Sequence, residues 1–202
     1  MQRIIIIAGP SGVGKTTVTN YLYQKYRIPR VITHTTRPMR KGEEEGKSYY
    51  FETNETFKKL HFFEHVRYGN YQYGSSKEAL KRAWEKSNLV TLIVDTDGVK
   101  TYLDELGDKA YFIYLTVSDT QILKQRLIER GDNPKEIEKR INSREFKRDL
   151  QLKPELQKDA HYLNNYDLVK TKEKLDVLIT KLKAWYIKDY NTWVIRYVMN
   201  CN

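Results

Sequence analysis

The feature that most constrains the fold is a run of eight residues at positions 9–16, Gly-Pro-Ser-Gly-Val-Gly-Lys-Thr. It matches the phosphate-binding pattern G-x-x-x-x-G-K-[ST] and follows an apolar run at 3–8, which predicts a buried parallel strand. Apolar residues at helical spacing come next, so the loop lies between a strand and a helix. Lys15 is expected to reach the terminal phosphates of a nucleoside triphosphate, and Thr16 to offer its hydroxyl to Mg²⁺. A glycine-rich turn that matches by chance is the alternative, but it leaves the lysine and threonine unexplained.

The chain of 202 residues has the length of one α/β domain and is 40% hydrophobic, enough for a sizeable core. Its 36 Lys and Arg against 26 Asp and Glu give a net charge of +10. Such a balance indicates anionic partners: a site that gathers several phosphates, nucleic acid, or only a solvated basic surface. No apolar run approaches the roughly 20 residues of a membrane span. Since a strand begins at residue 3, we expect no signal peptide, and since the one cysteine is Cys201, we expect no internal disulfide. Together these features favour a cytoplasmic protein. We expect a monomer or a homodimer.

Apolar, strand-like runs alternate with helical patterns along the chain, which predicts a parallel sheet with helices on both faces. Five such runs indicate five core strands, at 3–8, 31–34, 89–95, 111–117 and 160–163. The segment 33–73 breaks the alternation because it is polar, turn-rich and aromatic. We interpret that segment as a small lobe inserted between core strands. An amphipathic helix is predicted around 175–186.

A second group of motifs is spread over the rest of the chain. Residues 35–51 read Thr-Thr-Arg-Pro-Met-Arg-x-Gly-Glu-x-x-Gly-x-x-Tyr-x-Phe. The others are Phe63-Glu64-His65, Gly69-Asn70, Tyr73-Gly74-Ser75, Asp95-x-x-Gly98, Leu127-x-x-Arg130-Gly131, Arg140 and Asn164. Over roughly residues 3–180 these motifs resemble those of guanylate kinases, a family of P-loop nucleoside monophosphate (NMP) kinases.

The resemblance implies a single guanylate kinase-like domain over 1–202 that phosphorylates GMP, and dGMP, to GDP with ATP and Mg²⁺. It implies a five-stranded parallel P-loop core at 1–32, 87–130 and 151–202, an inserted α+β NMP-binding lobe at 33–86 and a helical lid at 131–150. Catalysis is implied for Lys15, Arg37, Arg130 and Arg140. ATP binding is implied for Gly9, Pro10, Ser11, Gly12, Val13, Gly14, Lys15, Thr16, Thr17, Arg126 and Asn164.

The chemistry of a phosphate acceptor agrees with this resemblance. A phosphate monoester carries about two negative charges, which suits the guanidinium forks of Arg37 and Arg40. The phenols of Tyr49 and Tyr73 would donate hydrogen bonds to the same phosphate. The alternatives are arginines that only solubilise the surface and tyrosines that belong to the core of the lobe.

Guanine presents N1–H and N2–H₂ side by side, a donor pair that the carboxylate of Glu64 accepts and that adenine lacks. By resemblance Glu64 reads the guanine, although a lone exposed glutamate is the alternative. Hydroxyls of Thr33 and Ser75 would serve the edge of the base. Asp95, after a core strand, would either contact guanine or order the water around Mg²⁺.

The sequence also departs from the family pattern. Ile93 stands where a second acid is frequent, and Asp97 replaces a frequent glutamine, so the chain reads as a divergent member. A kinase of another phosphate monoester (another nucleotide or a ribose phosphate) is therefore a competing hypothesis, as is a non-catalytic guanylate kinase-like binding module. The intact Lys15-Thr16 pair argues against the module. No strand-separating or base-stacking motif supports a nucleic-acid ATPase, so nucleic acid is not an expected partner.

Overall fold

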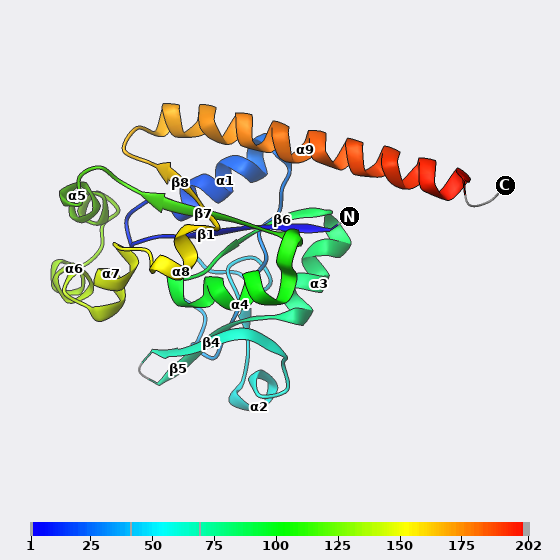
Figure 1. The fold of residues 1–202 in the computed structure, drawn as a ribbon. Helices are drawn as coiled ribbons and strands as arrows, with labels where there is room; N and C mark the ends of the chain where they lie inside the picture. Colours follow the sequence, from blue (N-terminus) through cyan, green and yellow to red (C-terminus); the bar gives the residue numbers. More distant parts are fainter. Residues whose placement is uncertain (1, 41, 69, 200–202) are drawn as a thin grey trace.

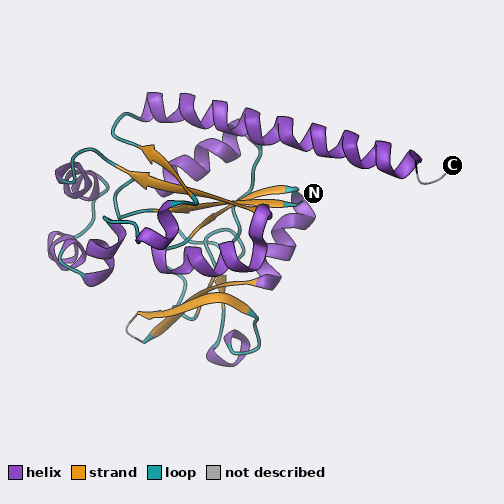
Figure 2. Ribbon diagram, viewed as in Figure 1, coloured by secondary structure: helices purple, strands orange, loops and turns teal. Residues whose placement is uncertain are grey.

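The core of the protein is a parallel sheet of four strands in the order β6-β1-β7-β8 (Figures 1 and 2). The computed structural model describes residues 2–40, 42–68 and 70–199, and its side chains except those of 68 and 184–199. The strands are β1 (Arg3–Ala8), β6 (Leu89–Ile93), β7 (Ala110–Thr116) and β8 (Ala160–Asn164). Since β1 lies between β6 and β7, the loop that follows it begins at the middle of the sheet.

The isoleucines of β1 explain how both faces of the sheet are covered. Side chains alternate along a strand, so Ile4 and Ile6 face one layer while Ile5 and Ile7 face the other, and all four are fully buried. The first layer holds α3 (Lys77–Lys86) and α4 (Thr96–Leu106), and the second holds α1 (Lys15–Tyr26) and α9 (Leu168–Met199). Figure 1 shows α1 and α9 together on one side of the sheet and α4 on the other.

Other helices connect these layers. They are the 3₁₀ turn η1 (Gly107–Lys109), α5 (Gln121–Glu129), α6 (Pro134–Ile141), α7 (Arg144–Asp149) and α8 (Pro154–Gln157). Helices α6 and α7 fall inside the segment predicted as a lid. In the part of the chain that the structure describes, none of these helices has the length and apolarity of a membrane span.

A second sheet, in the order β3-β2-β5-β4, lies below the core in Figure 1. Its strands are β2 (His34–Thr35), β3 (Tyr50–Phe51), β4 (Phe62–Tyr68) and β5 (Tyr71–Ser76), and α2 (Asn54–Phe57) lies beside them. Strands β4 and β5 form an antiparallel hairpin whose register shifts between Phe62 and Glu64. This sheet lies within the predicted lobe segment 33–86.

The core sheet differs from the prediction at the expected strand 31–34. Residues next to Pro29 reach the edge strand β6 only at Thr91, where Val31 N donates to Thr91 O (2.7 Å) and Thr91 N donates to Pro29 O (2.8 Å). The chain then turns away, and His34 pairs in the second sheet instead. The described core sheet therefore has four strands rather than five. The predicted helix 175–186 is part of the longer α9, and Cys201 lies outside the described residues.

Candidate active site

The loop between β1 and α1 adopts backbone conformations that only glycine tolerates well. Gly9 has φ +144°, and a β-carbon there would lie 2.2 Å from the backbone oxygen of Leu115. Gly14, with φ +98°, stands at the N-cap of α1 and touches the side chain of Asn165. The strand end, the loop and the first turn of α1 are thus packed closely, and the backbone N–H groups of α1 face the space in front of the loop.

A cavity of about 660 Å³ opens in front of the loop, and we call it the loop cavity. Loop residues and the helices α5 and α9 surround it. Its lining includes seven residues predicted to bind ATP: Ser11, Gly12, Gly14, Lys15, Thr16, Thr17 and Arg126. Arg130, Asn165 and Leu168 also line it.

Lys15 lies back across its own loop. Its Nζ donates hydrogen bonds to the backbone oxygens of Gly9 (2.6 Å) and Pro10 (3.1 Å). Burial lowers the pKa of Lys15 to about 8, and the charges of Asp149 and Asp95 oppose that shift. An anionic phosphate in the loop cavity would supply the counter-charge that the two carbonyl groups lack.

A second cavity of about 880 Å³ lies between the core and the second sheet, and we call it the lobe cavity. It shares Ser11 and Lys15 with the loop cavity, so the two spaces meet at the lysine. Of the residues predicted to bind GMP, the lobe cavity is lined by Thr33, Tyr49, Glu64, Tyr73 and Asp95. Arg140, Arg148 and Asp149 approach it from α6 and α7.

Glu64 is held in place from behind. The fully buried Ser75 donates its hydroxyl to Oε1 of Glu64 at 2.9 Å, across the β4–β5 hairpin. Burial raises the pKa of Glu64, the bond from Ser75 lowers it, and the charge of Asp95 adds to the increase. Ser75 thus orients the carboxylate rather than lining the cavity. The next residue, Ser76, caps α3 by accepting from Ala79 N.

The structure does not bring Arg37 and Arg40 to the described lining of the lobe cavity. Arg37 is buried and donates to both carboxylate oxygens of Glu43, at 2.9 and 2.7 Å. Its guanidinium lies 5.6 Å from the ring centre of Tyr49, so it stands directly behind the cavity wall. Arg40 is exposed, and its backbone N–H donates to the same carboxylate. In this conformation the carboxylate of Glu43 therefore accepts hydrogen bonds from both the side chain of Arg37 and the backbone of Arg40.

The predicted arginines of the lid divide between the two cavities. Arg130 lines the loop cavity and Arg140 the lobe cavity. Both form ion pairs with Asp132, which lies next to Gly131 between α5 and α6. One carboxylate thus joins an arginine of the loop cavity to an arginine of the lobe cavity.

At the end of β8 the structure places Asn165, rather than the predicted Asn164, at the loop cavity. Asn165 is buried, and its Nδ2 donates to the backbone oxygen of Val13 at 2.7 Å. Its Oδ1 is buried and has no hydrogen-bond partner among the described residues. Asn164 is exposed and accepts from Tyr166 N instead. Sequence reasoning also missed Arg148 and Asp149, because their helix reads as an ordinary charged, solvated helix.

These features define a P-loop nucleotide-binding protein in which a second substrate-sized cavity opens beside the loop lysine. The family model for guanylate kinase matches residues 1–189. The chain belongs to the guanylate kinase family.

Individual relatives agree with this assignment. The chain is 34% identical over 195 residues to the guanylate kinases of Helicobacter pylori strains ATCC 700392 / 26695 and HPAG1, covering 91% of this chain and of each relative. It is also similar in fold to the crystal structure of guanylate kinase from Anaplasma phagocytophilum, with a TM-score of 0.59 and 22% identity. That match covers 89% of this chain and 85% of the other.

Proposed function

We propose that the protein transfers the γ-phosphoryl group of ATP to GMP, and to dGMP, in a Mg²⁺-dependent reaction. The observation that carries the proposal is the meeting of two cavities at Lys15, one built from loop amides and the other containing an oriented carboxylate, Glu64. The family membership and the guanylate kinase relatives support the same reaction.

The lobe cavity would bind the acceptor. Glu64 would accept N1–H and N2–H₂ of guanine, and Thr33, which lines the same cavity, would offer its hydroxyl to the edge of the base. The phenols of Tyr49 and Tyr73 would meet the phosphate. Because Arg37 stands just behind Tyr49, an incoming dianion competes with Glu43 for its guanidinium, and binding would draw Arg37 and Arg40 toward the phosphate.

The loop cavity would bind the donor. Its backbone amides and Lys15 suit the β- and γ-phosphates, and the buried Oδ1 of Asn165 offers an acceptor to a base amino group. Thr16 lines this cavity beside Lys15, so its hydroxyl fits a magnesium ion that keeps most of its coordination for phosphate and water. When bound, Mg²⁺ would neutralise charge on the β- and γ-oxygens.

The chain's own residues then have little covalent chemistry to perform. The attacking oxygen of a monophosphate is already ionised, so no general base is needed, and catalysis consists of positioning and charge neutralisation. Lys15, Arg130 and Arg140 surround the junction where the transferred group would sit. Movement of the segment 33–75 and of α6 toward the core would bring the substrates together and exclude water, while α7 keeps its contacts with the core.

Calorimetric titration of GMP tests the role of Glu64. Glu64→Gln should weaken GMP binding roughly 10- to 100-fold, the value of hydrogen bonds to one charged group, and leave ATP binding unchanged. Glu85→Gln, an exposed change on α3, is the matched control. Equal GMP affinity in the two variants would refute the assignment of Glu64.

A further inference from the structure

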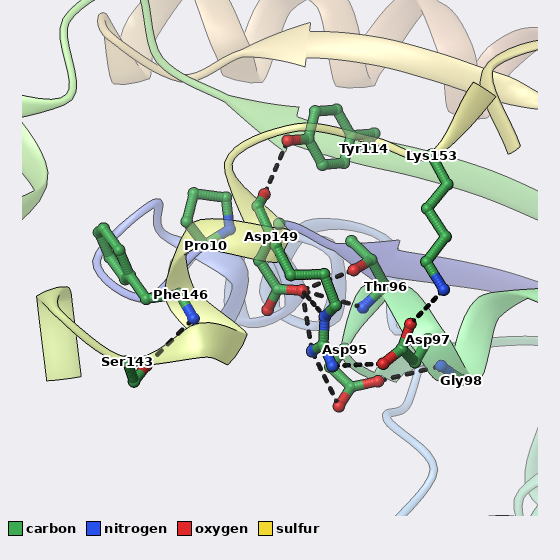
Figure 3. Close-up of polar contacts among 12 residues, drawn as sticks. Pro10, Asp95, Thr96, Asp97, Gly98, Tyr114, Ser143, Phe146, Asp149 and Lys153 are labelled. Atoms are coloured by element: carbon green, nitrogen blue, oxygen red, sulfur yellow. Dashed lines mark hydrogen bonds and ion pairs between the residues drawn. The ribbon is translucent and has the colours of Figure 1, made fainter.

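One guanidinium at the floor of the lobe cavity serves three carboxylates. Arg148, near the end of α7, forms ion pairs with Asp95 (3.2 Å), Asp97 (2.5 Å) and Asp149 (3.0 Å). Figure 3 shows Asp95, Asp97 and Asp149 close to one another, with Lys153 reaching Asp97. Only the planar fork of arginine presents enough donors in fixed directions to bridge such a group.

Two of the three carboxylates are also held by hydrogen bonds at the start of α4. Asp95 caps α4 by accepting from the backbone N–H of Gly98 at 3.0 Å, and Asp149 accepts from the hydroxyl of Thr96 at 2.6 Å. Arg148 and Lys153 form the ion pairs of these three carboxylates, and the charge of Lys15 also acts on Asp149 and Asp95. Loss of Arg148 would remove the ion pairs of Asp95 and Asp149 and leave Asp97 with Lys153.

Arg148 stands on a helix that is anchored to the core, although the sequence places it in the predicted lid. Phe146 of α7 is buried in the same cluster as Leu163 of β8 and Leu175 of α9. The phenol of Tyr114, on the core strand β7, donates to the backbone oxygen of Asp149 at 2.7 Å. These contacts hold α7, and with it Arg148, against the core sheet.

The position of the cluster matters for the acceptor. Asp95 lines the lobe cavity with Glu64, and its charge already acts on that carboxylate. A nucleoside monophosphate that enters this cavity brings about two further negative charges. Uncompensated aspartates on the cavity floor would repel it, and an unpaired Asp95 would compete for the donors that Glu64 is meant to accept.

We propose that Arg148 is a positioning residue for acceptor binding: it fixes Asp95 and cancels the charge of the neighbouring aspartates, so that a dianionic nucleoside monophosphate binds beside Glu64. This inference rests on the proposed function, because it assumes a monophosphate in the lobe cavity. It adds a residue of α7 to the machinery that selects the acceptor.

Steady-state kinetics of Arg148→Gln against Arg144→Gln test the inference, since Arg144 is an exposed arginine on the same helix. Arg148→Gln should raise KM for GMP roughly 10- to 100-fold, with KM for ATP unchanged and kcat near the wild-type value. Adding Asp97→Asn to Arg148→Gln should recover part of the loss, because it removes one uncompensated charge. A merely structural role predicts no such rescue.

An unchanged KM for GMP in Arg148→Gln, or an equal rise in both KM values without rescue, would overturn the inference. If Arg148→Gln does not fold, Arg148→Lys carries the comparison: it keeps one charge but loses the fork, so a KM for GMP equal to the wild-type value would overturn the inference equally. Wild-type protein that turns over no guanine monophosphate would instead overturn the proposed function.

Discussion

The side chain of Glu64 lies against the backbone of Gly98. A β-carbon at position 98 would stand 3.0 Å from Cγ of Glu64 and 3.2 Å from its carboxyl carbon, closer than ordinary van der Waals contact. Gly98 belongs to the first turn of α4, and Glu64 belongs to β4 of the second sheet. A helix of the core therefore sets the position of the carboxylate that we assign to guanine.

Gly98→Ala should consequently displace Glu64 by a few tenths of an ångström and weaken both bonds to the base. We expect KM for GMP to rise about tenfold, because part of a charge-assisted pair is lost, while KM for ATP stays the same. Lys100→Ala, an exposed change on the same helix, controls for general effects on α4. Steady-state kinetics check the prediction, and similar GMP constants for both variants would contradict it.

The pH dependence of GMP binding provides a second prediction. Burial raises the pKa of Glu64 above its ordinary value, and only the ionised carboxylate accepts both guanine donors. GMP binding should therefore weaken as the pH falls through that raised pKa. The phosphate of GMP titrates in a similar range, so the measured quantity is the ratio of Kd for Glu64→Gln to Kd for the wild type.

Calorimetry between pH 8 and pH 5 should show this ratio of Kd values falling toward one at low pH, because a protonated glutamate binds guanine much as a glutamine does. A ratio that stays constant over the range would mean that Glu64 does not change charge when GMP binds.

The neighbouring asparagines at the end of β8 form a natural pair of test and control. Asn165 faces the loop cavity and holds Val13, whereas Asn164 is exposed. Asn165→Ala should raise KM for ATP about tenfold, the cost of one lost hydrogen bond plus the disturbed loop, and Asn164→Ala should leave it unchanged. A larger rise in KM for ATP in Asn164→Ala than in Asn165→Ala would instead assign ATP binding to Asn164, the residue that the sequence pattern predicted.

Asp176 attaches α9 to α1 of the core, and the strength of this attachment should depend on pH. Its carboxylate accepts from Lys25 (2.6 Å), Tyr21 (2.5 Å) and Tyr26 (2.7 Å), all on α1. Hydrogen bonds from Lys25 and Tyr21 lower the pKa of Asp176 to about 2. Because the pKa is depressed on folding, the stabilisation is present above the ordinary value near 4 and is lost as the pH falls toward 2.

Asp176→Asn should lower the free energy of unfolding by about 1 kcal/mol at pH 7, a modest value because the group is partly exposed. The difference from the wild type should shrink between pH 5 and pH 3. Urea unfolding measures it, with the exposed Asp104→Asn as control. An undiminished difference at pH 3 would show that charge is not the cause.

Local sequence pattern was enough to predict several elements of this structure. The loop at 9–16 and the four isoleucines before it placed β1 at the centre of a parallel sheet, because a strand covered on both faces must be apolar throughout. The aromatic, turn-rich segment 33–73 breaks the alternation of strands and helices, which predicted a small inserted lobe; the second sheet was not predicted.

Which side chains contact one another, by contrast, cannot be predicted from local sequence pattern. Arg37 was expected to meet a phosphate, but the structure pairs it with Glu43, six residues away, because in this conformation a carboxylate is the nearest bidentate acceptor. Strand ends set another limit: whether Asn164 or Asn165 faces the loop depends on one residue of register at the end of β8. The role of Arg148 depends on three aspartates that only the fold gathers.

The rate of ADP formation from ATP and Mg²⁺ in the presence of GMP, dGMP, AMP, UMP or CMP tests the central claim most directly. We predict turnover with GMP and dGMP, and rates roughly 10⁴-fold lower with AMP, which leaves Glu64 unpaired. Turnover with neither guanine nucleotide, or an equal rate with AMP, would contradict the assignment of the lobe cavity to a guanine monophosphate.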